Sequence, residues 1–195
     1  MIERSAKQIT DWLIKTKSID ESEKDLYQYA IHSLILTIFP IVLSIAIGLA
    51  LKAPLNGLLV ILPFSFLRKY SGGFHAKKEA TCLVMSGLLL LACNALSIVL
   101  NCSWILLAIA CIMGISLICF SPIENENRPL YDEERVSYKR VTAIMVGCFI
   151  VINLLFFILK LYKPSICISI GIILPACLQI PCIIERIICK NDQKW

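Results

Sequence analysis

The sequence is short of charge. Only 17% of its 195 residues are Asp, Glu, Lys or Arg, whereas 58% are hydrophobic and the mean hydropathy is +0.78. Soluble domains carry about 25% charged residues. The composition therefore excludes an ordinary soluble domain and predicts an integral membrane protein.

Signals of several other protein classes are also missing. The charged start of the chain lacks a short apolar stretch with a small-residue cleavage site, so the hydrophobic segments themselves are expected to target it. Lys and Arg form no dense stripe among aromatic residues, and we expect no nucleic-acid partner. The ten cysteines never occur as CxxC, and the two histidines, His32 and His75, lie far apart. We therefore expect mostly packing cysteines, no metal and no other cofactor.

Six apolar runs follow one another along the chain: Ala30–Leu51, Leu55–Leu67, Thr81–Leu100, Trp104–Phe120, Val141–Leu159 and Pro164–Ile184. As a helix, the first run would span about 33 Å, enough to cross a hydrocarbon core of about 30 Å even with a bend at Pro40. The second run would span only about 20 Å. It is therefore either a short crossing or half of a re-entrant pair with its predecessor.

The basic residues distinguish between possible topologies. If all six runs cross and the N-terminus is cytoplasmic, 16 of the 19 basic residues lie inside, leaving Lys52, Lys160 and Lys163 outside. If only Leu55–Leu67 failed to cross, the split would be 7 inside and 12 outside, or 12 inside and 7 outside with the chain inverted. The positive-inside rule favours six crossings, or a re-entrant pair that preserves their parity, with both termini cytoplasmic.

Ahead of the first run, Ile2, Ala6, Ile9 and Leu13 recur at helical spacing between charged residues. This pattern predicts an amphipathic helix that lies either on the bilayer surface or against the protein's own loops. The predicted fold is thus an all-α polytopic membrane protein with about six transmembrane or re-entrant helices plus this interfacial helix. We expect one domain over residues 1–195, made of the amphipathic segment 1–25, the first two runs in 30–67, a catalytic loop at 68–79, a helical hairpin at 80–120, a polar cytoplasmic loop at 121–140, a second hairpin at 141–184 and a cytoplasmic tail at 185–195.

The polar stretch RKYSGGFHAKKEATC, residues 68–82, places His75 seven residues before Cys82. A neighbouring imidazole, the N-terminal end of the next helix and two lysines at 77 and 78 would all favour a cysteine thiolate. Residues seven apart in one unbroken helix are separated by about 10.5 Å along the axis, beyond a hydrogen bond. We therefore expect the helix to begin after His75, with Gly72 and Gly73 allowing the loop to fold back.

Simpler interpretations of the same residues stay open. A histidine beside lysines is usually a surface residue, and a cysteine in an apolar run usually serves packing. Glu79 could orient the imidazole, as the third group of a triad does, or be a solvated carboxylate in the first helical turn. Asn94 and Asn153 are expected to form hydrogen bonds between helices rather than to bind a transported ligand.

A small membrane transporter or a peptide-exporter subunit without proteolytic activity is the alternative function. Against it, the long runs contain no Asp, Glu, Lys or Arg, and no inverted repeat is evident.

The residues Arg68, Gly72–Gly73, His75–Ala76 and Cys82, set between a short and a long apolar run, resemble the signature of the accessory gene regulator protein B family. These are membrane peptidases of Gram-positive quorum sensing. The similarity covers nearly the whole chain, including the amphipathic N-terminus and the polar SPIENENRPL loop. It implies that His75 and Cys82 form the catalytic pair of a thiol protease. It also implies supporting roles for Arg68, in substrate positioning or oxyanion stabilisation, and for Gly73, in the shape of the loop.

The resemblance further implies a reaction. A membrane cysteine endopeptidase would remove the C-terminal tail of a small autoinducing-peptide precursor through an acyl-enzyme thioester. A cysteine or serine of the precursor would then displace the enzyme and close a thiolactone or lactone ring. The expected partners are the precursor, the lipid bilayer of the bacterial cell membrane and a second copy in a homodimer. The basic residues Arg68, Lys69, Lys77 and Lys78 could hold an acidic tail.

Overall fold

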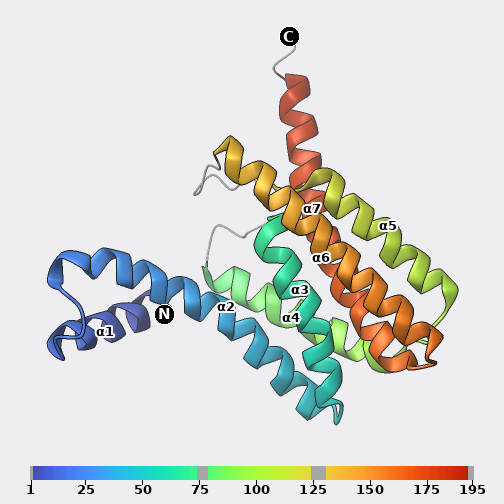
Figure 1. Cartoon of the computed structure of the whole chain (residues 1–195). Coiled ribbons are helices and arrows are strands. Elements are labelled where there is room, and N and C mark those ends of the chain that lie inside the picture. Colours follow the sequence, from blue (N-terminus) through green and yellow to red (C-terminus); the bar gives the residue numbers. More distant parts are fainter. Residues whose placement is uncertain (1, 74–78, 124–130, 193–195) are drawn as a thin grey trace. The chain divides into compact units, whose positions relative to one another are not determined.

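The computed structural model describes residues 2–73, 79–123 and 131–192, without some side chains near the ends of the helices. Within these ranges the chain forms seven α-helices and one short 3-10 helix, and no extended strand. In order they are α1 (Ile2–Lys15), η1 (Glu21–Glu23), α2 (Lys24–Ala50), α3 (Pro54–Ser71), α4 (Glu79–Val99), α5 (Trp104–Phe120), α6 (Asp132–Ile158) and α7 (Tyr162–Asp192), all drawn in Figure 1. The prediction of an all-α fold is confirmed.

The helices follow the apolar runs of the sequence, and local residues set several of their ends. Pro54 occupies the start of α3, where its missing N–H removes no helical hydrogen bond. Ser103 caps α5 by accepting a hydrogen bond from the Leu106 N–H at 3.3 Å. Lys52 and Lys160, with φ of 58° and 60°, turn the chain between α2 and α3 and between α6 and α7.

Several helices extend beyond their apolar runs into polar segments. α3 continues through Arg68 to Ser71, α6 already begins at Asp132 inside the segment expected to be a polar loop, and α7 continues to Asp192 through the expected tail. Charged residues at helix ends explain part of this extension. Basic residues are favourable in the last turn of α3, and acidic residues in the first turn of α6, because they oppose the helix dipole. The polar segments are therefore shorter as loops than the sequence suggested.

Within the described part of the chain, three helical stretches are long and apolar enough to cross a membrane, namely residues 21–50, 133–158 and 162–184. The apolar stretches at 84–99 and 104–120 are shorter. These helices are those of a membrane protein, as the composition predicted. Whether Leu55–Leu67 crosses or re-enters stays a prediction.

The chain divides into two compact units, residues 1–43 and 44–195. In the first, α1 is the amphipathic helix predicted from the sequence. Its Ala6 and Thr10 are fully buried, whereas Ile9 and Trp12 are exposed. An ion pair of 2.8 Å joins Asp11 of α1 to Lys24 at the start of α2. α1 thus packs within its own unit and still presents apolar side chains outward.

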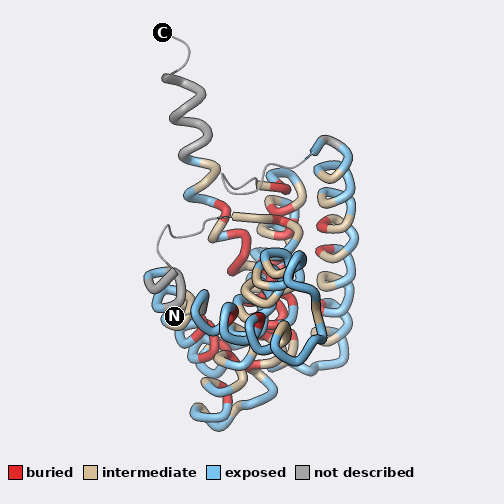
Figure 2. The backbone as a smooth tube through the Cα atoms, turned by 90° about the vertical axis from the view of Figure 1, so that its left-hand side faces the viewer, coloured by how far each residue is buried: buried red, intermediate tan, exposed pale blue. Residues whose placement is uncertain are grey.

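In the second unit α7 is the central helix. Of its apolar stretch, 61% is buried within the protein, compared with 17% for α6. Buried residues, red in Figure 2, form two clusters that both draw on α7. One contains Val60, Cys93, Ile166, Cys167, Ile170 and Leu174, and the other Leu67, Leu117, Val146, Ile168, Ile172 and Ala176. A Cβ on Gly171 would lie 2.7 Å from the Val60 carbonyl oxygen, so α7 and α3 meet at a distance that only glycine permits.

Two buried asparagines join helices of this unit. The Asn94 amide donates to the Ser44 hydroxyl at 3.2 Å, linking α4 to the end of α2. The Asn153 amide donates to the Ser169 hydroxyl at 2.8 Å and accepts from the Ser165 hydroxyl at 2.6 Å, linking α6 to α7. The prediction that these amides form hydrogen bonds between helices is confirmed. Such bonds stabilise helix association where lipid offers no alternative partner.

Candidate functional site

The residues that leave α3, Ser71 to Gly73, form a sharp turn that we call the α3 exit. Gly72 has φ of 70° and ψ of −159°, and Gly73 has φ of 130°. Residues with a Cβ rarely adopt these backbone angles, whereas glycine adopts them readily. A Cβ on Gly72 would collide with the Ile123 carbonyl oxygen, and one on Gly73 with the Arg68 guanidinium. Both glycines therefore have a positive φ, and at Gly72 a backbone carbonyl leaves no room for a Cβ.

Hydrogen bonds from three parts of the chain fix the α3 exit. The Ser71 carbonyl oxygen accepts from the Ile123 N–H at 2.9 Å and from the Gln179 side-chain amide at 3.0 Å. The Gly72 carbonyl oxygen accepts from Arg68 Nη1 at 3.0 Å. Gly72 and Ile123 also form a single parallel β-bridge. The start of the predicted catalytic loop is thus held by α3, by residues 121–123 and by α7.

The structure brings only some of the predicted site residues together. Arg68 and the two glycines are in contact at the end of α3. Glu79 is the first residue of α4 and Cys82 lies in its first turn. His75 lies outside the described residues, as do the side chains of Glu79 and Cys82. The predicted pairing of His75 with Cys82, and the role of Glu79, stay predictions.

The position of Cys82 in α4 has a chemical consequence. The backbone N–H groups of a first helical turn have no partner within the helix, and the positive end of the helix dipole lies there. A thiolate is favoured at such a helix N-terminus in proteins generally. The Cys82 side chain lies outside the described residues, and its activation stays a prediction.

Gln179 of α7 is a site residue that the sequence analysis missed. It is fully buried, and its Nε2 donates to the Ser71 carbonyl oxygen and, at 3.3 Å, to the Ser121 hydroxyl. The available signal was a single amide inside the apolar run Pro164–Ile184, because a polar side chain within a membrane helix needs a partner. The sequence alone could not say which part of the chain supplies that partner.

Aromatic contacts join the end of α3 to the start of α6. Tyr70 packs edge-on against Tyr138 with ring centroids 5.6 Å apart, and the Lys69 ammonium lies 5.5 Å from the centre of the Tyr70 ring. Lys69 is exposed. Of the four basic residues expected to form a rim, Arg68 and Lys69 lie in this last turn of α3, whereas positions 77 and 78 are outside the described part of the chain.

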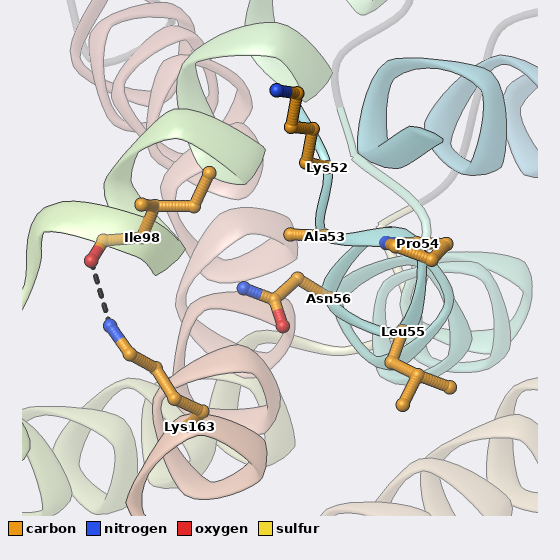
Figure 3. A pocket seen from close by; sticks show the side chains of 7 residues that line it. All are labelled: Lys52, Ala53, Pro54, Leu55, Asn56, Ile98 and Lys163. Atoms are coloured by element: carbon orange, nitrogen blue, oxygen red, sulfur yellow. Dashed lines mark hydrogen bonds between the residues drawn. The ribbon is translucent and has the colours of Figure 1, made fainter. Parts of the chain in front are cut away.

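A pocket of about 390 Å³ lies near the other end of α3, as Figure 3 shows. It is lined by Lys52, Ala53, Pro54, Leu55, Asn56, Ile98 and Lys163. The Lys163 ammonium donates to the Ile98 carbonyl oxygen at 2.7 Å, so this lysine caps the end of α4. About 25 Å of helix separates the first turn of α3 from Gly72, and the pocket is not part of the α3 exit.

Among the residues that the structure describes, no group of three or more His, Cys, Asp or Glu side chains is arranged to hold a metal ion. Eight cysteines are described, all as free thiols. Cys93 and Cys167 are buried in the helical core, whereas Cys119, Cys148 and Cys177 are exposed on apolar helices.

A family model described as accessory gene regulator B matches residues 6–183 of the chain. An AgrB-like protein of Clostridium perfringens strain SM101 is 26% identical over 145 residues, covering 69% of this chain and 67% of that protein. The accessory gene regulator protein B of Staphylococcus lugdunensis is 25% identical over 117 residues, covering 60% of this chain and 62% of that protein. An AgrB-like protein of Listeria monocytogenes serotype 4a is 29% identical over 119 residues, covering 60% and 58%. No solved structure matches the chain.

Proposed function

Because this chain belongs to the accessory gene regulator B family, we propose that it is a membrane cysteine endopeptidase that processes a small precursor peptide for quorum sensing. Family membership itself links the chain to the accessory gene regulator system. The proposal adds the chemistry: cleavage of the precursor's C-terminal tail by Cys82, assisted by His75, followed by ring closure.

The proposed first step exchanges an amide for a thioester. The Cys82 thiolate attacks the carbonyl carbon at the cleavage site, the C–N bond breaks, and the tail leaves as an amine that takes its proton from the His75 imidazolium. In the second step a thiol or hydroxyl of the precursor loses its proton to His75 and attacks the thioester. A thiolactone or lactone forms and Cys82 leaves again as a thiolate.

One observation carries this proposal more than any other. The α3 exit is a glycine turn fixed on both sides, and the next described helix begins at Glu79 with Cys82 in its first turn. In the proposal, the loop after the α3 exit must bring His75 close to the Cys82 thiolate. A fixed α3 exit would set the direction of that loop, and a position in the first turn of a helix would favour the thiolate. The bonded state of Asn94 and Asn153 also disfavours the transporter alternative, since both amides already serve helix packing.

The proposal includes roles for the remaining candidates and an orientation. Arg68 would face the reacting carbonyl or the acidic tail, Gly72 and Gly73 would set the direction of the loop, and Glu79 would either orient the imidazole or stabilise the first turn of α4. Both termini would be cytoplasmic, which places the α3 exit on the cytoplasmic side.

Co-expression with a candidate precursor peptide tests the proposal. Mass spectrometry should detect tail cleavage with the wild-type protein and none with Cys82→Ala or His75→Ala. The matched control is Cys93→Ala, which changes a second cysteine of α4 that is buried in the core. This control should still cleave the precursor, because its thiol serves packing. Normal cleavage by Cys82→Ala would show that the assigned nucleophile is wrong.

A further inference from the structure

We propose that Gln179 is a positioning residue of the proposed peptidase: its buried amide fixes the α3 exit and thereby the loop that carries His75. This inference rests on the proposed function and assigns a role to a residue in the last helix, 108 positions from Ser71 in the sequence. Gln179 does not touch the reacting atoms in this proposal. It acts through Ser71 and Ser121.

The orientation of the Gln179 amide follows from its partners. The Ser71 carbonyl oxygen can only accept a hydrogen bond, so the group that faces it at 3.0 Å must be the NH₂ group. The same NH₂ group reaches the Ser121 hydroxyl oxygen at 3.3 Å. With both of its N–H groups used in this way, one side chain ties the end of α3 and the segment after α5 to α7.

The location of these bonds gives them more than a packing role. The Ser71 carbonyl belongs to the last residue before Gly72, and its second partner, the Ile123 N–H, leads into the central polar loop. The backbone at Gly72 and Gly73 is adopted readily only by glycine, and within α3 Arg68 already binds the Gly72 carbonyl oxygen. Bonds from outside α3 add to this by fixing the end of the helix against the rest of the unit. Gln179 donates one of them from the central helix of the unit.

The burial of Gln179 supports the same conclusion. Its side chain is fully buried, and its Oε1 accepts no hydrogen bond from the part of the chain that the structure describes. An apolar residue would fill this position without desolvating an amide, so the two hydrogen bonds that the Gln179 amide donates account for its presence here.

Asn153 offers a matched comparison within the same unit. It is also a fully buried amide with two side-chain hydrogen bonds that involve α7, but these bonds reach Ser165 and Ser169. Ser169 lies ten residues before Gln179, about 15 Å along the helix. Removing the Asn153 amide should therefore cost similar stability without moving the α3 exit.

The experiment compares Gln179→Met with Asn153→Leu in full-length protein reconstituted in nanodiscs. Two quantities are measured by quenched reaction and mass spectrometry. They are the rate at which a candidate precursor forms its acyl thioester on Cys82, called the adduct here, and the KM for that precursor. Gln179→Met should slow adduct formation by about tenfold or more while KM stays within about threefold, because a displaced loop affects the reacting geometry more than binding. Asn153→Leu should leave both values within about twofold of the wild type.

A second variant covers the case in which Gln179→Met does not fold. Ser121→Ala removes only the weaker of the two bonds and should slow adduct formation by about threefold, again with little change in KM. The inference would be overturned if Gln179→Met formed the adduct as fast as Asn153→Leu does. The same holds for Ser121→Ala if it has to take the place of Gln179→Met. Either result would leave the proposed function intact.

Amide exchange separates this inference from the proposed function. If the wild-type protein forms no adduct on Cys82, the proposed enzyme is wrong, and backbone hydrogen–deuterium exchange then decides the positioning role. Exchange of the Ile123 amide should be faster in Gln179→Met than in the wild type or in Asn153→Leu. Equal exchange in all three proteins would overturn the inference independently of activity.

Discussion

Replacing Gly72 by alanine tests the geometry of the α3 exit directly. The φ of 70° and ψ of −159° at this position lie in a region that residues with a Cβ rarely adopt, at a cost of about 1–3 kcal/mol. The new Cβ would also collide with the Ile123 carbonyl oxygen. Moving that segment away would weaken the 2.9 Å bond from the Ile123 N–H to the Ser71 carbonyl oxygen, worth about 0.5–1.5 kcal/mol.

The two contributions together predict a loss of about 1.5–4.5 kcal/mol in the free energy of unfolding. For a protein of this size, 1 kcal/mol corresponds to about 2–4 °C in the midpoint of thermal unfolding. Gly72→Ala should therefore lower the midpoint by roughly 3–18 °C. The reaction of buried thiols such as Cys93 and Cys167 with a fluorogenic maleimide during heating in detergent measures this midpoint.

Gly147→Ala is the matched control. Gly147 lies within α6, and an added Cβ would meet no atom within 4 Å. The same substitution should raise the midpoint slightly there, because alanine is favoured over glycine inside a helix by about 1 kcal/mol. If Gly72→Ala left the midpoint within about 1 °C of the wild type, the described backbone of the α3 exit would be wrong.

Two further predictions concern the ends of α2. A Cβ on Gly57 of α3 would collide with the Ser44 carbonyl oxygen of α2, and the Ser44 hydroxyl donates to the Gly57 carbonyl oxygen at 2.9 Å. Gly57→Ala should therefore cost about 1–3 kcal/mol of stability and lower the unfolding midpoint by several degrees. An unchanged midpoint would show that α2 and α3 are not so close. At the other end, the Lys24 ammonium beside Asp11 holds the pKa of that carboxyl below its ordinary value. The stabilisation by this pair is therefore present above the ordinary pKa of an aspartate and is lost as the pH falls through the lowered pKa. Trp12 fluorescence can be recorded alone when the other tryptophans are replaced by phenylalanine. In that background the Trp12 signal should change over this acidic pH range when Asp11 is present and stay constant in Asp11→Asn. An equal pH dependence of both proteins would exclude the ion pair as the cause.

Much of the fold could be predicted from the sequence because each helix is encoded locally. Runs such as Trp104–Phe120 are long, apolar and bounded by polar residues, and the observed α5 has the same limits. The helix boundaries were less predictable in polar segments. Arg68 to Ser71 and the residues after Asp132 lie outside the apolar runs, yet they continue helices. Hydropathy marks where a chain can enter lipid, whereas backbone hydrogen bonding decides where a helix ends.

The candidate site was predictable only in part. The spacing of His75 and Cys82, and the glycine pair before them, are visible in the sequence and carry the resemblance to the family. The partners of the glycine pair are not visible. Nothing near residue 72 in the sequence indicates that Ile123 and Gln179 would meet it.

The sequence by itself determined that this chain is a helical membrane protein of the accessory gene regulator B family, because composition, periodicity and a short motif are local properties. Only the tertiary structure decided which residues meet at the α3 exit. Glycines such as Gly171 let α7 approach α3 closely, and this contact places the Gln179 amide against a carbonyl 108 residues away. A buried polar group must find a partner, but packing of the helices determines which one it finds.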